Sequence, residues 1–419
     1  MNRTSLALLF PLFVACSDPR ELAPPGEEVA SKAQRITQAA PDADIGDAAS
    51  STNALSLALL ARHPDGNFIF SAYSVTSAAS MLEAGARNDT LSGMKKALQQ
   101  TLSEDRHHRA MNTLEAALET RGATAKGKDG KPFRLVVTNQ LFAQKGQHLE
   151  PAYLDTLAQE YGSGLRLLDF STDAARASIN SWVGQRTEGK ITDLFAPGSL
   201  LGAKLAVVNT LYFNAAWNQP FPKANTAPAP FTLLDGTTPT VSMMRNSQLG
   251  AKAAVVDGTD IVEILYDGQD VSLLIVAPPT GKFGAVVQDL DAGKLKKLTD
   301  ALRAEPLDLK MPKFKFDTRF DLTEDLKALG MTDAFEESKA DFSGMTGDRS
   351  LFVGVAVHQA IIILDESGTE AAAATGFGVF ATSAPPQPRP VTIDRPFLFF
   401  IRDVKTGVPL FSGRVVNPN

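Results

Sequence analysis

The chain has little of what many catalytic and metal-binding sites require. It contains one cysteine, which excludes both a disulfide within the chain and a site built from several cysteines. Its five histidines lack metal-ligand spacing, and neither a Gly-x-Ser-x-Gly nor a His-Glu-x-x-His motif is present. We therefore expect no metal site, no cofactor and no enzyme activity. The adjacent pair His107-His108 is expected at the surface.

A strong excess of either charge is also missing. The chain has 41 Lys and Arg against 47 Asp and Glu, a net charge of −6. This balance gives no electrostatic reason to expect binding to nucleic acid or direct attraction to anionic lipid. Residues 122–129 approach a phosphate-binding loop, but Asp129 stands where Ser or Thr must hold magnesium. The segment is therefore predicted to be a solvated hairpin loop.

The apolar run near the N-terminus, residues 6–15, is too short to span a bilayer. It follows Arg3 and is typical of a signal peptide, so we predict a signal peptide over residues 1–15. Residues 16–47 are rich in acidic residues, Ala, Ser and Pro, and have little to bury. They are predicted to form a flexible polar tether. The folded domain is expected over residues 48–419.

What the chain does have is enough length and apolar content for a sizeable core, with 419 residues and 44% hydrophobic composition. Apolar segments at 135–144, 207–217 and 271–277 read as strands, and the segment 321–331 reads as a helix. Strands and helices alternate without a regular βαβ rhythm. This order indicates one domain of the α+β class.

The stretch 365–386 does not fit a single local structure. Its four consecutive alanines, residues 371–374, favour helix, but Gly376, Gly378 and the pair Pro385-Pro386 oppose it. Read with a period of two, one face is small or apolar throughout and carries Thr369, Ala371, Ala373, Thr375, Phe377 and Val379. Such a face suits a strand that slides between two others. A flexible surface loop remains the alternative.

The proximal part of this stretch resembles the hinge of the serpins, a family of protease inhibitors. The family pattern is Glu, any residue, Gly, Thr or Ser, Glu and then small residues. The matching positions are Glu366, Gly368, Thr369, Glu370, Ala371, Ala372, Ala373, Ala374 and Thr375. The resemblance continues over 48–419. It implies three β-sheets, eight or nine helices and an exposed reactive loop at 366–390.

Two further parts of the chain resemble serpin motifs beneath the main sheet. One is similar to Asn-x-Phe-x-Ser-Pro-x-Ser, although Ala72 replaces the proline, and the other to Val-Asn-Ala-x-Tyr-Phe-x-x-x-Trp, although Thr210 replaces the alanine. The resemblance implies a polar latch, called the shutter in this family, that holds the strands shut. Its members here would be Ser71, Ser74, Asn209 and His358.

The resemblance also implies a contact at the place where the loop would enter the sheet, called the breach. There the acidic side chain of Glu366 would pair with Lys313, beside Trp217.

The scissile bond follows from the same resemblance. Serpin loops commonly place it about fourteen residues past the hinge glycine, which here gives Thr382-Ser383. A small residue at Thr382 suits the shallow pocket of elastase-like proteases. The alternative bond is Phe380-Ala381, which suits chymotrypsin-, subtilisin- or papain-like enzymes. The expected partner is thus a serine or cysteine protease, held in a covalent complex by a monomeric inhibitor.

Two rival functions stay open for a chain of this kind. A serpin fold can serve as a non-inhibitory binding or carrier protein, although such members tend to lose the small hinge residues that are present here. The chain could also be a substrate that is cleaved without trapping, which the flexible Gly376 and Gly378 would favour.

Residues 12–16, Leu-Phe-Val-Ala-Cys, resemble the lipobox of bacterial lipoproteins, with Phe13 where Leu is usual. The resemblance implies a lipid on Cys16, which would be the only link to a membrane. Because Ser17 is not the aspartate linked with inner-membrane retention, an outer-membrane or cell-surface anchor is expected. The alternative is an ordinary secretory signal and a secreted protein.

Overall fold

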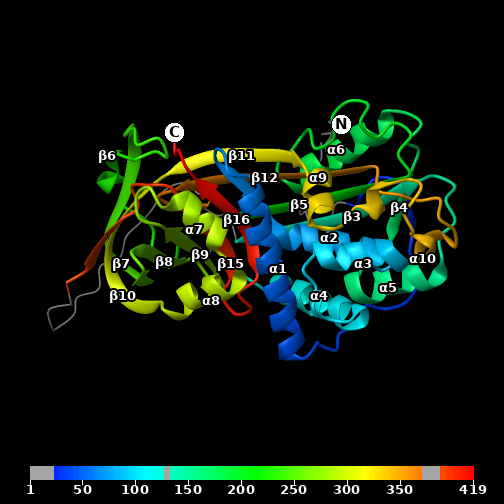
Figure 1. The fold of residues 1–419 in the computed structure, drawn as a ribbon, viewed down its shortest axis with the longest axis horizontal. Coiled ribbons are helices and arrows are strands. Elements are labelled where there is room, and N and C mark those ends of the chain that lie inside the picture. Colours follow the sequence, from blue (N-terminus) through cyan, green and yellow to red (C-terminus); the bar gives the residue numbers. More distant parts are fainter. Residues whose placement is uncertain (1–22, 127–132, 370–386) are drawn as a thin grey trace, which may run out of the picture.

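The computed structural model describes residues 23–126, 133–369 and 387–419, and arranges their strands in two sheets (Figure 1). In spatial order, the seven-stranded sheet consists of β1 (Glu27–Val29), β4 (Leu165–Leu168), β3 (Arg134–Gln144), β5 (Leu205–Ala216), β13 (Gly368–Thr369), β12 (Val355–Asp365) and β11 (Phe314–Asp321). The nine-stranded sheet consists of β14 (Arg389–Thr392), β10 (Arg303–Pro312), β7 (Thr240–Val256), β8 (Thr259–Leu265), β9 (Val271–Ala277), β15 (Phe397–Asp403), β16 (Pro409–Val415) and β2 (Phe68–Phe70), with β6 (Ala227–Pro230) on β7.

Within the described ranges there are ten α-helices, where the sequence predicts eight or nine. They are α1 (Asp42–Arg62), α2 (Ala72–Glu83), α3 (Asn88–Ala97), α4 (Glu104–Glu119), α5 (Pro151–Tyr161), α6 (Ala174–Arg186), α7 (Phe283–Asp289), α8 (Ala292–Asp300), α9 (Thr323–Leu329) and α10 (Ser343–Thr346). Two short 3₁₀ turns, Lys223–Asn225 and Asp333–Phe335, complete the helical part. The predicted α+β class is confirmed.

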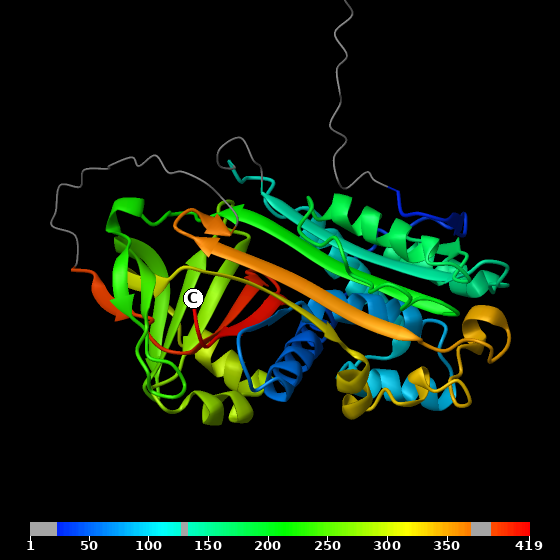
Figure 2. The ribbon, with the colours of Figure 1, turned by 90° about the horizontal axis from the view of Figure 1, so that it is seen from above.

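The central strand β5 is buried on both faces, which explains its nearly continuous apolar sequence. Leu211 and Phe213 belong to the main core between the two sheets. Val208 belongs to a second, smaller core under α6, where it is grouped with Ile179 and Val183. Figure 2 shows β3, β5 and β12 running side by side, with α6 over the outer face of the sheet.

Helix α2 fills the space beneath the middle of this sheet. It begins after Ser71, whose Oγ accepts a hydrogen bond from the backbone nitrogen of Ser74 at 3.0 Å. Every residue of α2 is buried, and many are Ala or Ser. Small side chains let the helix lie close to β3 and β5 on one side and to β16 on the other. The helix therefore lies directly beneath the middle strands of the seven-stranded sheet.

The resemblance implies three sheets, but the strands in the described residues form two. Strand β7 pairs with β6 at its first residues and with β8 at its last, while β10 pairs along most of its length. Because β7 has 17 residues, it is long enough to run through both regions. The hydrogen bonding therefore joins two expected sheets into one of nine strands.

The polar tether predicted for residues 16–47 is wrong for its described part, residues 23–47. Strand β1 pairs with β4, and the buried side chain of Ala40 joins the main core. Helix α1 begins at Asp42, ahead of the expected start of the domain. The composition of this segment suggested that it had nothing to bury, but its polar groups find partners on α4 and α5.

The surface position expected for His107-His108 is also wrong, because α4 turns both rings inward. His107 Nε2 lies 2.8 Å from Ser80 Oγ, and His108 Nδ1 lies 2.6 Å from Tyr161 Oη. Burial lowers the pKa of His107 to about 3 and that of His108 to about 4. In β12, burial likewise lowers the pKa of His358 to about 3. All three rings are therefore neutral in the folded protein near pH 7.

We predict that the protein loses stability as the pH falls from about 6.5 toward 4. The unfolded chain binds protons at these histidines below 6.5, whereas the folded chain resists them, so each contributes about 1.4 kcal/mol of lost unfolding free energy per pH unit. Thermal unfolding of the wild type at pH 7 and pH 5 measures this loss. The variant His107→Gln should flatten the pH dependence.

The matched control is His148→Gln, because the His148 side chain is 72% exposed and its substitution should leave the pH profile unchanged. An unfolding temperature that does not fall between pH 7 and pH 5 would contradict the prediction.

Candidate functional site

The residues that matter most lie where β5 and β12 part. Gly368 and Thr369 form a two-residue strand, β13, between them. Thr369 stands opposite Ala215 of β5 and Leu364 of β12. At the far end of the same strands, β5 pairs directly with β12 in parallel register, and these pairings involve only 355–356 and 206–207 among the described residues. The sheet is thus already entered by a third strand at one end and closed at the other.

Glycine is required at position 368 for two reasons. Its φ is +149°, a conformation that side chains rarely tolerate. A Cβ there would also lie 2.2 Å from the carbonyl oxygen of Ala215. The adjacent Thr369 is buried, and its Oγ1 lies 2.8 Å from Oη of Tyr266. The entry point therefore accepts only glycine at position 368, and the next side chain, that of Thr369, is short and polar.

The three predicted breach residues are brought together at this entry point. Lys313 Nζ lies 3.3 Å from Glu366 Oε1, and the indole Nε1 of Trp217 donates to the carbonyl of Asp365 at 3.0 Å. Thr226 Oγ1 also donates to Glu366 Oε1 at 2.8 Å. Burial alone would raise the pKa of Glu366, but hydrogen bonds from its own backbone and from Thr226, together with the Lys313 charge, hold the pKa below its usual value. Glu366 is therefore ionised at neutral pH.

Two members of the breach were missed by sequence reasoning. Tyr266 stacks on Trp217 with 4.5 Å between ring centroids, and Thr226 completes the contacts of Glu366. Neither belongs to a motif that the sequence displays. The aromatic residue just after the apolar segment 259–265 is the only local signal for Tyr266.

The four predicted shutter residues also meet, beneath the middle of the sheet. The backbone nitrogen of Ser71 donates to His358 Nε2 at 3.0 Å, so the proton of the neutral ring lies on Nδ1. That proton is donated to Asn209 Oδ1, with 3.0 Å between the heavy atoms. Asn209 Nδ2 in turn donates to the carbonyl of Ser74. The latch therefore ties β5, β12 and the start of α2 together.

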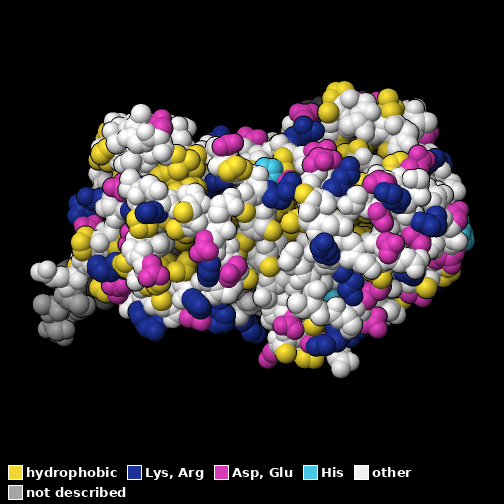
Figure 3. Space-filling view, in the orientation of Figure 1, with side chains coloured by type: hydrophobic (Ala, Val, Ile, Leu, Met, Phe, Trp, Pro, Cys, Tyr) yellow, Lys and Arg dark blue, Asp and Glu magenta, His cyan; other side chains and the backbone are white. Residues whose placement is uncertain are grey.

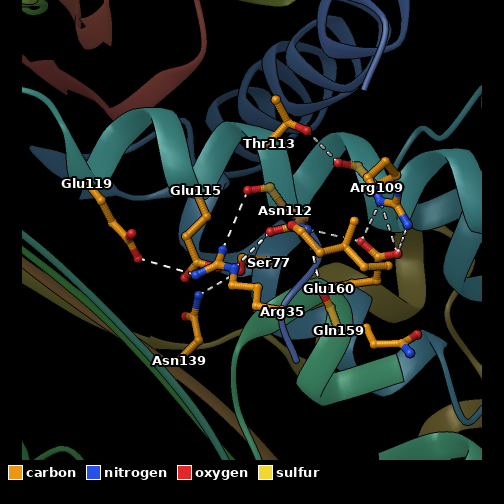
Figure 4. A network of polar contacts seen from close by, with 11 residues as sticks. Arg35, Ser77, Arg109, Asn112, Thr113, Glu115, Glu119, Asn139, Gln159 and Glu160 are labelled. Carbon is orange, nitrogen blue, oxygen red and sulfur yellow. Dashed lines mark hydrogen bonds and ion pairs between the residues drawn. The ribbon is translucent and has the colours of Figure 1, made fainter. Parts of the chain in front are cut away.

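The latch has two members that the sequence motifs did not indicate. Asn209 Nδ2 also donates to Asn139 Oδ1 of β3 at 2.7 Å, and Asn139 Nδ2 donates to Ser77 Oγ of α2 at 2.7 Å. The second of these bonds is drawn in Figure 4. The side-chain amides of Asn139 and Asn209 both have buried hydrogen-bond partners. Breaking the latch would therefore leave several buried polar atoms without a hydrogen bond.

Next to the latch lies a small apolar cavity of about 40 Å³ under the closed end of the β5–β12 boundary. Its lining includes side chains from α2, from both strands and from the α9 region: Val75, Ala79, Val207, Leu326, Phe335 and Ala356. Packed cores rarely leave such space unfilled, so the cavity marks a region that is not optimally packed in this form.

Several predicted site residues lie outside the described residues. These are the hinge positions 370–375, both candidate scissile bonds, Thr382-Ser383 and Phe380-Ala381, and the lipidation site Cys16. Over the ranges that are described, no group of three or more His, Cys, Asp or Glu is arranged to hold a metal ion. None of the helices in these ranges has the length and apolar character needed to cross a bilayer.

Comparison with known proteins identifies the family. The family described as Serpin (serine protease inhibitor) matches residues 50–418. Human leukocyte elastase inhibitor is 34% identical over 383 residues, which cover 87% of this chain and 96% of that protein. Human antithrombin-III is 32% identical over 368 residues, which cover 85% of this chain and 78% of that protein.

Solved structures agree on the fold. The native state of tengpin, a thermophilic serpin, superposes with a TM-score of 0.80 over 93% of this chain and all of that chain, at 24% identity. Thyroxine-binding globulin in complex with thyroxine gives 0.75 over 88% of this chain and 99% of that chain, at 28% identity. The fold expected from the hinge and shutter motifs is thereby confirmed, and the chain belongs to the serpin family.

Proposed function

We propose that this protein is a suicide-substrate inhibitor of serine endopeptidases. It traps the acyl-enzyme by inserting its reactive loop as a new strand between β5 and β12. The observation that carries the proposal is β13, because its two residues already occupy the entrance to that position. A strand that has started in one register continues in it unless a bulge intervenes.

The register supports this path in detail. Thr375 follows Thr369 by six residues, and six residues back from Ala215 and Leu364 lie Asn209 and His358. Directly opposed residues point to the same face of a sheet. The inserted Thr375 would therefore bring its hydroxyl to the latch. That hydroxyl can replace hydrogen bonds that the latch loses when the strands separate.

Two residues further along, the register reaches the apolar cavity. Phe377 would come opposite Val207 and Ala356, both of which line it. The ring would then be buried against apolar side chains from α2 and the α9 region. Burying an aromatic side chain in this way contributes about 2–3 kcal/mol. Insertion thus gains free energy at a place where the present form is loosely packed.

The chemical step begins with ordinary proteolysis. The serine oxygen of the protease attacks the carbonyl carbon of Thr382, the bond to the nitrogen of Ser383 breaks, and that amine leaves with a proton. The acyl-ester to the protease remains. About fifteen inserted residues at ~3.3 Å each carry the enzyme ~50 Å across the sheet. Distortion of the protease there stops water from hydrolysing the ester, so the intact inhibitor is a kinetically held form.

The preferred targets are elastase-like proteases, because Thr382 offers a small side chain to the primary specificity pocket. The similarity to leukocyte elastase inhibitor over most of the chain supports this class. Chymotrypsin-, subtilisin- or papain-like enzymes are the second choice, and they would cut after Phe380. The inhibitor acts as a monomer and requires no cofactor.

The site of action is outside the cell. Residues 1–15 act as a signal peptide, and Cys16 carries a lipid that anchors the protein to the outer membrane or cell surface. Mass spectrometry of Cys16 in the protein isolated from its own cells tests this point. An unmodified mature protein in the medium would instead show secretion without an anchor.

The first prediction from this function concerns the hinge. The variants Thr369→Arg and Ala371→Glu should be cleaved but should no longer form an SDS-stable complex with an elastase-like protease. A charge driven beneath the sheet is left unpaired, which should raise the inhibitor consumed per protease about tenfold or more. The measurement is SDS gel electrophoresis together with titration of protease activity.

Thr369→Ser is the matched control, because it keeps a small hydroxyl residue beside Tyr266 and should inhibit like the wild type. Stable complex formation by both charged variants would contradict insertion. A wild type that is cleaved without any complex would make the protein a substrate, and one that is neither cleaved nor trapped would favour a carrier function.

A second prediction concerns stability after cleavage. Cutting the loop with a protease that is not trapped should raise the unfolding temperature by about ten degrees or more, because the new strand completes the sheet. In Phe377→Ala, the cleaved form should unfold a few degrees below the cleaved wild type, while the intact forms unfold together.

Gly378→Ala serves as the control here, because position 378 faces away from the cavity in this register. Equal effects of Phe377→Ala on the intact and cleaved forms would contradict the register.

A third prediction places the cut. The C-terminal fragment released from the covalent complex should begin at Ser383 when its mass is measured. A fragment beginning at Ala381 would move the scissile bond to Phe380 and the target class to proteases that prefer aromatic residues. Cutting there would shorten the inserted strand by ~7 Å, which should make trapping less efficient.

A further inference from the structure

The N-terminal segment 30–41 lies across α5 and α4 and is hydrogen-bonded to both. The backbone nitrogen of Ile36 donates to the carbonyl of Gln159 in α5 at 2.9 Å. The carbonyl of Ile36 accepts from Asn112 Nδ2 in α4 at 2.8 Å. Further along, the backbone nitrogen of Ala40 donates to Thr113 Oγ1 at 2.8 Å. The segment is therefore fixed to the two helices through its backbone.

Arg35 adds side-chain contacts along one face of α4. Its Nε donates to Asn112 Oδ1 at 2.8 Å, and its Nη2 lies 2.8 Å from Glu115 Oε2. Its Nη1 reaches Glu119 Oε1 at 3.4 Å. Figure 4 shows these groups converging on the guanidinium from successive turns of the helix. A single arginine thus holds the segment to residues 112, 115 and 119, which lie on one face of α4.

The same network ties α4 to α5. Asn112 Nδ2 also lies 3.3 Å from Glu160 Oε2, and Glu160 accepts from Arg109 Nε at 3.0 Å and from its Nη2 at 2.8 Å. The carboxylate of Glu160 and the amide of Asn112 are both buried. Arg35 therefore joins a network whose polar groups all have hydrogen-bond partners. The network would lose hydrogen bonds if residues 30–41 moved away from α4 and α5.

The elements that flank residues 30–41 in the chain contact different sheets. On one side, the segment continues into β1, the edge strand of the seven-stranded sheet, where Glu28 pairs with Arg166 of β4 at 3.0 Å. On the other side it continues into α1, which packs against β16 of the other sheet and against α7 and α8. Residues 30–41 thus connect the edge strand of the seven-stranded sheet to a helix that packs against the nine-stranded sheet.

Opening the sheet changes the distance that this segment bridges. A strand inserted between β5 and β12 requires β5, β3, β4 and β1 to move away from β12 and β11 by about one strand spacing, ~4.8 Å. Residues 30–41 are bonded both to the edge that moves and to the helix leading to the second sheet. Because α4 packs against α1, which in turn packs against β16 of the second sheet, residues 30–41 would have to shift on α4 or release it when the sheet opens.

We propose that residues 30–41 form an N-terminal clasp, pinned by Arg35, that opposes opening of the sheet and slows insertion of the reactive loop. The proposal rests on the proposed function because it concerns the same insertion. The clasp acts on the barrier between the two forms. Losing it accelerates insertion, with or without a protease.

The test is the rate at which the intact protein, warmed mildly without protease, converts to a heat-resistant monomer with its loop inserted. We expect Arg35→Ala to convert at least about fivefold faster than the wild type, and Arg35→Lys to be intermediate because lysine lacks the planar fork. Lys32→Ala is the matched control, since Lys32 is an exposed cation on the same segment. It should convert at the wild-type rate.

Exchanging the charges of Arg35 and Glu115 distinguishes loss of the clasp contacts from a general loss of protein stability. Arg35→Glu should convert fast, and adding Glu115→Arg should return the rate toward that of the wild type. The loop-cleaved forms of wild type and Arg35→Ala should unfold at the same temperature, because the clasp has already shifted there. Equal destabilisation of intact and cleaved forms, or equal conversion by Arg35→Ala and Lys32→Ala, would overturn the proposal.

Failure of this proposal and failure of the proposed function give different results. A wild type that forms SDS-stable complexes while Arg35→Ala converts at the control rate removes the clasp and leaves the inhibitor. A wild type that traps no protease, with faster conversion of Arg35→Ala, removes the inhibitor and leaves the clasp.

Discussion

The structure depends above all on how the boundary between β5 and β12 is kept closed. In the proposed mechanism these two central strands separate, which would be difficult if backbone hydrogen bonds joined them along their whole length. Here direct pairing of the two strands is confined, in the described residues, to one end. The middle is held by His358 and Asn209 over the start of α2, and a buried polar latch of this kind is stable only while every group keeps its partner. In the proposed mechanism it would resist partial opening until a new strand supplies replacement hydrogen bonds.

The two ends of that boundary differ in the contacts that their side chains make. At the entrance, Gly368 lets the backbone approach β5 closely, and the ionised Glu366 is held by Lys313 and Thr226. At the closed end, apolar side chains surround a cavity. The polar groups at the entrance have hydrogen-bond and ion-pair partners, whereas the apolar side chains at the closed end leave a cavity. In the proposed mechanism this difference would favour insertion of the loop from the entrance toward the closed end.

The proposed clasp in the described N-terminal residues would add a second restraint at a distance. The network around Arg35 lies on α4 and α5, away from the entrance, and it acts on the edge of the same sheet through β1. The latch holds the strands from beneath, and the clasp holds the outer edge. If both proposals hold, the sheet opens only when both restraints yield, and the closed form is long-lived without being the most stable one.

The amino-acid sequence by itself determined the α+β class and the hinge motif, and its resemblance to the family indicated which residues to expect at the latch and breach. The period-two pattern of small residues, the obligatory glycine and the apolar strands are local features, so they can be read along the chain. The tertiary structure alone decided what those residues meet. Asn139, Ser77, Tyr266 and Thr226 join the site through contacts between distant segments, which no local pattern encodes.

The same reason explains the errors. The composition of residues 23–47 predicts a tether, and the pair His107-His108 is expected at the surface from the sequence. Yet Arg35 finds partners 77 residues away on α4, and both rings turn toward Ser80 and Tyr161. Composition reports how much a segment can bury by itself. Whether its polar groups are satisfied depends on neighbours that only the folded chain supplies.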